Sequence, residues 1–347
     1  MLDDNNVLQQ RDPSGALAIA AGEYKQAEFE ATIWNGEHDH RPIRNIVVAG
    51  MGGSALAALV VKVWLRDVLT EPFEVVRGYS LPQYVGPNTL VIVSSCSGNT
   101  EETLGCLEQA RARGAQVTIM TSGGRLLERA RELSIAHVVL PDRAEIEPRM
   151  TTIAQTRALA QLLAHFTIIP PSYYQEIAQQ VSMLATASED WTPNVTTDKN
   201  LAKQLALLAV GKTAVIYGGE ITAPLAYKWK ISWNENSKNV AFWNEYPEFN
   251  HNEFLGWTSH PVEKPYVIFD LFSRFEHSQV QRRFEISDRL LSGMRPKATR
   301  VELVGDSVLA QLLWGCILAD FVSIYLAILN GVDPTPVALI EKLKQEL

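Results

Sequence analysis

Residues 89–103 read Thr-Leu-Val-Ile-Val-Ser-Ser-Cys-Ser-Gly-Asn-Thr-Glu-Glu-Thr, and this stretch decides the fold. Its first five residues are an apolar run that predicts a buried strand, and residues 104–110 after it predict a helix. Hydroxyl side chains and a glycine therefore lie where a strand turns into a helix. Such a junction offers backbone N–H groups and the positive end of a helix dipole, and Ser and Thr add donors without charge. The sequence predicts an anion-binding site here, with phosphate as the expected ligand.

The same order of strand, turn and helix recurs through the first half of the chain. Further strands are expected at residues 45–49, 72–79, 117–121 and 136–140. The first of them runs into Gly50-Met51-Gly52-Gly53-Ser54 and a helix over residues 55–69. This alternation predicts a mainly parallel sheet with helices on both faces.

The glycine-rich turn at residues 50–54 has two interpretations. It lacks the full dinucleotide-binding fingerprint, because its third glycine falls at position 53 instead of 55. Taken alone, it predicts a tight turn in which Gly53 allows close packing. Beside the serine stretch it predicts one wall of a pocket, because ligands of open α/β sheets bind at the carboxyl ends of the strands.

The pattern restarts in the second half. An apolar run at 214–217 ends in Gly218-Gly219 and leads into a helix over 221–230, with later strands at 267–270 and 300–304 and a closing helix at 308–329. We interpret this as a loose internal duplication. The fold class is therefore α/β, with two domains at residues 1–152 and 153–347, the second including connecting helices and the C-terminal helix.

Composition narrows the classes of function. The chain has 347 residues and a formal net charge of −8, which argues against a nucleic-acid binder. Its three cysteines, Cys96, Cys106 and Cys316, fit neither a metal motif nor a disulfide framework, so a reduced, cytoplasmic setting is expected. The first residues lack the features of a signal peptide. Polar residues interrupt the apolar run at 308–329, which favours a buried core helix over a membrane span.

Helix capping offers a second explanation for part of the serine stretch. Thr100 with Thr103, and Asn99 with Glu102, have the spacing of helix caps. Capping accounts for one or two of these residues but not for the whole cluster. Cys96 is interpreted as a small filler and not as a nucleophile, because no basic residue lies near it in sequence.

The turn at 50–54 together with residues 94–103 resembles the sugar isomerase (SIS) domain. Two such domains in a chain of this length resemble the bifunctional phosphoglucose/phosphomannose isomerases. The segments that support the narrower resemblance are Glu147-Pro148-Arg149, residues 233–238, residues 247–253 and residues 333–337. The resemblance implies an enzyme that interconverts glucose 6-phosphate or mannose 6-phosphate with fructose 6-phosphate in carbohydrate metabolism. It also implies a homodimer.

Aldose–ketose conversion moves a proton between two neighbouring carbons through an enediolate. A carboxylate suits this task, because its acid form can return the proton. The resemblance implies that Glu235 is the base, while a solvated helix glutamate is the ordinary alternative. Glu245, Glu248 and Glu253 are competitors nearby, of which the last two are better suited to orient His251 or to form structural bonds.

Ring opening needs a proton shuttle. His251 is the candidate, because histidine donates and accepts protons near neutral pH, and a structural histidine is the alternative. In the proteins that the chain resembles, this histidine comes from the partner subunit, which implies the same here.

A fixed cation would stabilise the enediolate, and Arg149 fits this role unless it forms an interdomain ion pair. The resemblance implies that Lys344 of the C-terminal helix reaches the sugar. Lys342 is the alternative, and the spacing after Asp333-Pro334-Thr335 favours Lys344. Thr335 is a possible further contact.

The phosphate is assigned to the hydroxyls of Ser54, Ser95, Ser97 and Thr100, with the backbone of Gly53 and Gly98. Neutral donors suffice where helix ends are aligned. No cluster of ligands predicts a metal, and no nicotinamide or ATP motif is present, so no cofactor is expected.

Two rival functions remain open. One is another SIS enzyme, such as an amino-sugar isomerase, although the chain leaves no room for a glutaminase domain. The other is a sugar-phosphate sensor without catalysis, which the acidic balance and the presence of Glu235 and His251 disfavour.

Overall fold

The structure is a computed structural model that describes residues 1–142, 145–259, 261 and 264–346, with the backbone alone at 344 and 345. The chain divides into two compact units. We call Glu23–Ser182 the N-terminal unit, and Met1–Gly22 together with Met183–Leu347 the C-terminal unit.

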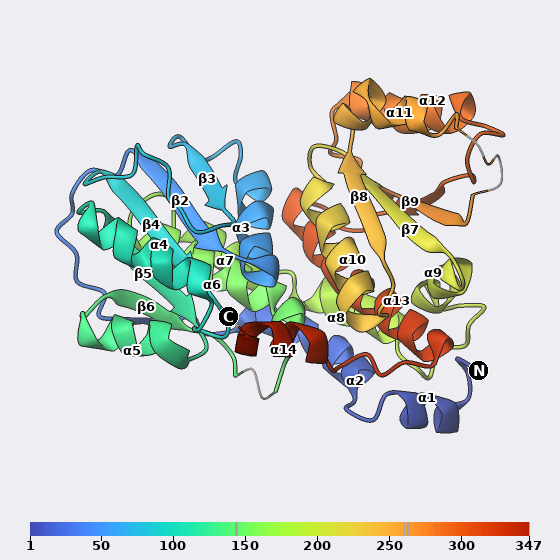
Figure 1. Cartoon of the computed structure of the whole chain (residues 1–347), viewed down its shortest axis with the longest axis horizontal. Coiled ribbons are helices and arrows are strands. Elements are labelled where there is room, and N and C mark those ends of the chain that lie inside the picture. Colours follow the sequence, from blue (N-terminus) through green and yellow to red (C-terminus); the bar gives the residue numbers. More distant parts are fainter. Residues whose placement is uncertain (143–144, 260, 262–263, 347) are drawn as a thin grey trace. The chain divides into compact units, whose positions relative to one another are not determined.

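The N-terminal unit is built on a six-stranded sheet with the order β1-β6-β5-β4-β2-β3 (Figure 1). All neighbouring strands pair in parallel except β1, which is antiparallel to β6 at one edge. The elements in chain order are η1 Glu23–Glu28, β1 Ile33–Trp34, β2 Asn45–Gly50, α3 Gly52–Trp64, β3 Phe73–Val76, β4 Thr89–Ser94, α4 Glu101–Ala112, β5 Gln116–Thr121, α5 Gly124–Glu132, β6 Ala136–Val139, η2 Pro148–Met150, α6 Thr152–His165 and α7 Ser172–Ala178.

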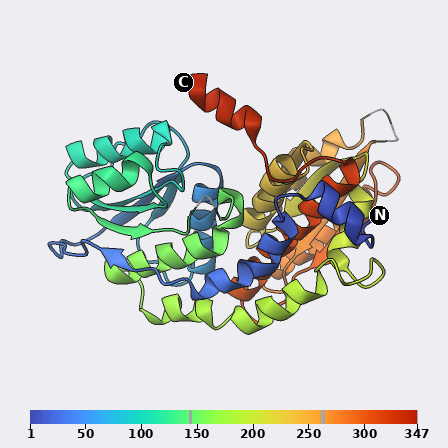
Figure 2. The same ribbon diagram turned by 90° about the horizontal axis from the view of Figure 1, so that it is seen from below.

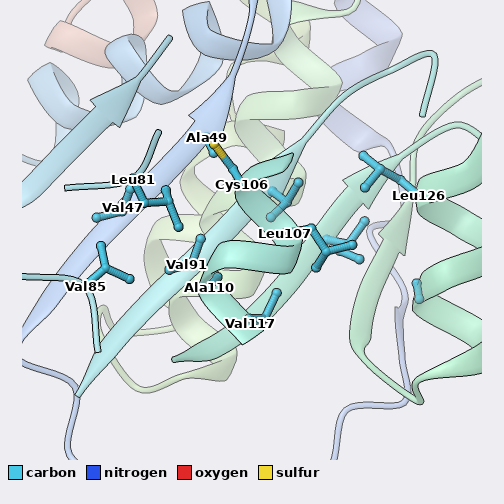
Figure 3. Packing of buried hydrophobic residues seen from close by; sticks show 13 residues of the cluster. Val47, Ala49, Leu81, Val85, Val91, Cys106, Leu107, Ala110, Val117 and Leu126 are labelled. Carbon is cyan, nitrogen blue, oxygen red and sulfur yellow. The ribbon is translucent and has the colours of Figure 1, made fainter. Parts of the chain in front are cut away.

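Helices cover both faces of this sheet. The pair α4 and α5 packs on one face, and α3 and α6, which pack against each other, lie on the other (Figures 1 and 2). Because both faces are covered, the central strand β4 is buried at every residue and reads as a continuous apolar run. Figure 3 shows the core under α4, where Leu107 and Ala110 meet Val91 and Val117 of the strands.

The C-terminal unit repeats this plan on a smaller, fully parallel sheet with the order β10-β9-β7-β8. Helix α10 packs on β7 and β8 and also against α13, and one face of the sheet carries an aromatic core that includes residues of α12. The elements are α1 Asn5–Arg11, α2 Ala16–Gly22, α8 Val181–Asp190, α9 Leu201–Ala209, β7 Thr213–Gly218, α10 Ala223–Asn236, β8 Ala241–Glu245, η3 Glu248–His251, α11 Glu253–Gly256, β9 Tyr266–Phe272, α12 Ser278–Leu290, β10 Thr299–Glu302, α13 Val308–Asn330 and α14 Ala338–Glu346.

Helix α13 is the centre of the C-terminal unit. The Ser307 hydroxyl accepts a hydrogen bond from Ala310 N at 3.1 Å and caps its start, and Gly331 ends it with a left-handed φ of 72°. Among the described residues, it is the helix long and apolar enough to cross a membrane, yet 94% of its most apolar window is buried inside the protein. This is the burial of a core helix, as the sequence predicts.

The predicted fold class, two α/β domains with mainly parallel sheets flanked by helices, is confirmed. The compact units differ from the predicted boundary between residues 152 and 153. Helix α6 packs on α3 and η1 and so belongs to the N-terminal unit, while α2 packs on α13 in the C-terminal unit. Strands β1 and β8 were not predicted.

Candidate active site

The serine stretch lies at the topological switch point of the N-terminal sheet. Strands β2 and β4 are neighbours, but β2 continues through α3 to β3 on one side, and β4 continues through α4 to β5 on the other. Their last residues, Gly50 and Ser94, are register partners. The two loops therefore leave the sheet at the same level, which is where open α/β sheets bind ligands.

Three hydroxyl groups converge in the loop after β4. Ser95 Oγ lies 2.8 Å from Thr100 Oγ1 and 3.2 Å from Ser97 Oγ, and Ser97 Oγ lies 3.3 Å from Thr100 Oγ1. The N–H of Gly98 donates to Ser95 Oγ at 3.2 Å. The three hydroxyls rotate to suit a guest, so the group can donate several hydrogen bonds to phosphate oxygens at the start of α4.

Gly98 is required by the shape of this loop. Its φ is 67°, and a Cβ atom there would lie 1.8 Å from the carbonyl oxygen of Gly123. A side chain at position 98 would therefore force apart the loops that follow β4 and β5.

Ser54 and Cys96 connect the loop after β2 with the loop after β4. The N–H of Cys96 donates to Ser54 Oγ at 3.3 Å, and Cys96 Sγ lies 3.6 Å from Thr151 Oγ1. Ser54 and Cys96 are both buried. This packing agrees with Cys96 as a small buried filler.

The capping explanation for the serine stretch is wrong in its details. Thr100 is the N-cap residue of α4, but among the described residues no side chain makes a capping hydrogen bond there. The Thr100 hydroxyl turns to Ser95 and Ser97 instead. Asn99 caps a different helix, because its Oδ1 accepts from the N–H of Arg125 in α5 at 3.0 Å.

Arg149 lies in the same unit as the serine stretch, on the short helix η2. A Cβ atom on Gly53 would lie 3.1 Å from Pro148 O and 3.6 Å from the Cα of Arg149, so the glycine lets η2 approach the start of α3. The Arg149 side chain is almost fully buried, and its Nη1 donates to Glu147 Oε2 at 3.2 Å. Gly53 therefore has the packing role that the sequence allowed for it.

Glu235 lies in the C-terminal unit, half-buried in the last turn of α10. Its backbone oxygen accepts a hydrogen bond from Lys238 Nζ at 2.5 Å, and the same ammonium group donates to Pro334 O at 3.0 Å. Lys238 thus ties the end of α10 to the segment that contains Thr335. Lys238 belongs to the segment 233–238 that carries the resemblance, but the sequence assigns it no role. Its left-handed φ of 55° marks it as a residue in an unusual turn.

The competing glutamates make other contacts. Glu253 accepts hydrogen bonds from the Tyr217 hydroxyl and from Asn244 Nδ2, and Glu248 accepts from Asn252 Nδ2. Burial raises the pKa of Glu245, at the end of β8, and the nearby carboxylates of Glu220 and Glu248 add to this rise.

His251 is exposed at the end of η3, although Phe249 in the same turn is buried in the aromatic core. Thr335 is half-buried, and its N–H donates to Asp333 Oδ1 at 2.9 Å. Position 344 lies in α14, but the Lys344 side chain is outside the described residues. Lys342 is exposed, with its Nζ 4.0 Å from Glu346 Oε1.

Two family models match the chain. The SIS domain matches residues 41–165, and the bacterial phospho-glucose isomerase C-terminal SIS domain matches residues 198–347. The protein therefore belongs to the class of proteins that contain two SIS domains in tandem.

Curated relatives narrow this class. The chain is 36% identical to the bifunctional phosphoglucose/phosphomannose isomerase of Caldicellulosiruptor bescii, covering 88% of this chain and 90% of the relative. It is 33% identical to the enzyme of the same name from Aquifex aeolicus, covering 95% and 97%. The chain belongs to the family of bifunctional phosphoglucose/phosphomannose isomerases.

Solved structures agree on the fold. A glucose-6-phosphate isomerase like protein from Thermus thermophilus superposes with a TM-score of 0.66 at 17% identity, covering 100% of this chain and 99% of that chain. This likeness concerns the architecture alone.

Proposed function

We propose that the protein interconverts glucose 6-phosphate and mannose 6-phosphate with fructose 6-phosphate through an enediolate. The observation that carries this proposal is the convergence of the Ser95, Ser97 and Thr100 hydroxyls at the switch point of the N-terminal sheet, in a member of this isomerase family. We assign phosphate binding to these hydroxyls, to Ser54 and to the backbone of Gly53 and Gly98. The rival functions, an amino-sugar isomerase and a non-catalytic sensor, gain no comparable support.

We further propose that Glu235 transfers the proton between C1 and C2 of the sugar. A carboxylate that takes the proton from one carbon can return it to the other, and one base serves both aldoses because they differ only at C2. His251 would open the sugar ring, Arg149 would stabilise the enediolate, and Lys344 and Thr335 would contact the sugar.

Replacing Glu235 by Gln tests the assigned base. The amide keeps the size of the side chain but takes up no proton, so kcat is expected to fall by about 10²–10⁴-fold. The measurement is steady-state turnover with each aldose phosphate, with far-ultraviolet circular dichroism to check the fold.

Glu245→Gln is the matched control, because it changes a neighbouring glutamate in the same way. It should keep most of the wild-type kcat. Near-normal turnover in Glu235→Gln, or a comparable loss in Glu245→Gln, would move the base away from Glu235.

We also propose a cytoplasmic homodimer in which each site receives His251 from the partner chain, acting in glycolysis and gluconeogenesis. The exposure of His251 supports this, because an exposed imidazole is accessible to a partner chain. Phe249 anchors the backbone of η3 in the core and leaves the imidazole facing outward.

Subunit complementation tests the shared site. Glu235→Gln and His251→Ala are each expected to be nearly inactive. If the site is shared, a mixed dimer of the two variants contains one site with both native residues, so co-refolding should restore activity. Mixed dimers that form but stay inactive would contradict a shared site.

A further inference from the structure

The two sheets of this protein allow a comparison of loops within one chain. The order β5-β4-β2-β3 of the N-terminal unit matches the order β10-β9-β7-β8 of the C-terminal unit. The loop after β9, residues 273–277, therefore corresponds to the serine loop after β4. The turn after β7, residues 219–222, corresponds to the glycine-rich turn after β2.

A carboxylate of the chain occupies this place in the C-terminal unit. Glu276 Oε1 accepts hydrogen bonds from the N–H groups of Ile221 at 2.9 Å and Thr222 at 3.0 Å, just before the start of α10. The Thr222 hydroxyl lies 3.2 Å from the same oxygen. The glutamate is 4% exposed, and its second oxygen, Oε2, is buried with no hydrogen-bond partner among the described residues.

The turn after β7 is shaped around this side chain. A Cβ atom on Gly219 would lie 2.4 Å from the carboxyl carbon of Glu276, so a side chain at position 219 would displace the carboxylate from this place. Burial raises the pKa of Glu276, whereas the hydrogen bonds from Ile221 and Thr222 oppose the rise. The carboxylate thus receives the backbone N–H groups that an anion would receive at a helix start.

The surroundings of the two loops differ in charge. The serine loop offers neutral hydroxyls at residues 95, 97 and 100. At the corresponding edge of the C-terminal sheet, Glu220 lies close enough to Glu245 and to Glu276 to raise the pKa of both. Further negative charge from a bound phosphate is disfavoured there.

We propose that Glu276 is a built-in anion that fills the counterpart of the phosphate pocket in the C-terminal unit. Each chain would then hold one sugar phosphate although it contains two related domains. Removing this carboxylate, together with the charge of Glu220, would create a second binding site for an inorganic anion.

The test counts phosphate ions bound per chain by equilibrium dialysis with labelled inorganic phosphate. The double variant Glu276→Ser/Glu220→Gln should bind one ion more than the wild-type protein. Glu220→Gln alone and Glu276→Gln alone should bind as many phosphate ions per chain as the wild type, because in both variants a side chain still fills the pocket. The difference between variants is independent of isomerase activity, so its outcome is separate from that of the proposed function.

Two results would overturn the proposal. The first is a wild-type chain that already binds two phosphate ions. The second is a double variant that gains no phosphate ion. If the double variant does not fold in a chloride buffer, adding phosphate should restore its folding. Failure of phosphate to restore folding would also contradict an anion-binding site at this place.

Discussion

Asp270 is a buried carboxylate beside the aromatic core of the C-terminal unit. It lies on β9 between Ile268 and Phe272, and side chains two positions apart on a strand face the same side. The Arg295 guanidinium is also buried there, centred 5.5 Å from the Tyr217 ring. Burial raises the pKa of Asp270 to about 7, with Asp288 adding to the rise and Arg295 and Arg300 opposing it.

This shift predicts how stability depends on pH. An unfolded aspartate has a pKa of about 3.9, so between about pH 4 and 7 the folded state keeps a proton that the unfolded state has lost. The stabilisation is fully present below this window and is lost as pH rises through it. The free energy of unfolding of the wild type, minus that of Asp270→Asn, should therefore fall with pH by at most about 1.4 kcal/mol per unit.

Urea denaturation of both proteins across this pH range measures the difference. Asp306→Asn, which removes an exposed acid, is the control for the substitution itself. A difference between the wild type and Asp270→Asn that is constant from pH 4 to 7 would contradict a raised pKa.

Single residues also show what a sequence hides. The hydroxyls of residues 95, 97 and 100 are close in sequence, so their convergence was predictable from the strand–helix junction. The partner of Asn99 was not, because Arg125 lies in α5, after the next strand of the chain. Glu276 was missed for the same reason, since it bonds a turn some fifty positions earlier.

At the scale of elements, α10 and α13 are held in register by polar side chains inside an apolar interface. Lys228 Nζ donates to both carboxylate oxygens of Asp320 at 2.7 and 2.6 Å, and Ser232 Oγ donates to Asp320 Oδ1 at 2.8 Å. One turn further, Asn236 Nδ2 donates to Ser323 Oγ at 2.8 Å. Because Lys228, Ser232 and Asn236 share one helix face, they fix the rotation of α10 and with it the direction of Glu235.

Breaking this pair should be costly. Lys228→Met leaves Asp320 as an uncompensated buried charge and is expected to destabilise the protein by about 3–5 kcal/mol. The double variant Lys228→Met/Asp320→Leu removes both charges and should regain most of the loss. Chemical denaturation measures both. A double variant as unstable as the single one would contradict this account of the pair.

An exposed ion pair serves as the control for the buried pair of Lys228 and Asp320. Arg111 and Glu108 lie 3.0 Å apart on the surface of α4, and Arg111→Ala should cost about 0–1 kcal/mol.

The strands that were easiest to predict from the sequence are the most deeply buried ones. Strands β2, β4, β5 and β7 are central and wholly or nearly wholly buried, so their apolar runs marked them. Strand β8 is an edge strand, and Phe242 within it is exposed, so its pattern is weak. Strand β1 has only two residues, too few for any periodicity.

At the scale of the whole molecule, the chain contains the same domain plan twice but uses the two copies differently. One copy has neutral hydroxyls at its switch point, and the other has a buried glutamate. The sequence revealed the duplication through its repeated strand–glycine–helix order. It did not reveal that the first 22 residues return to the C-terminal unit, where Arg11 Nη1 donates to Ile328 O at 2.6 Å. Such long-range packing leaves no local pattern.

The most direct test of the proposed function is a pair of coupled assays on the pure protein. Glucose 6-phosphate and mannose 6-phosphate are supplied separately, and the formation of fructose 6-phosphate is followed in each. We expect fructose 6-phosphate from both aldoses, with both activities lost together in Glu235→Gln. Its formation from neither aldose, or from only one of them, would contradict a bifunctional isomerase.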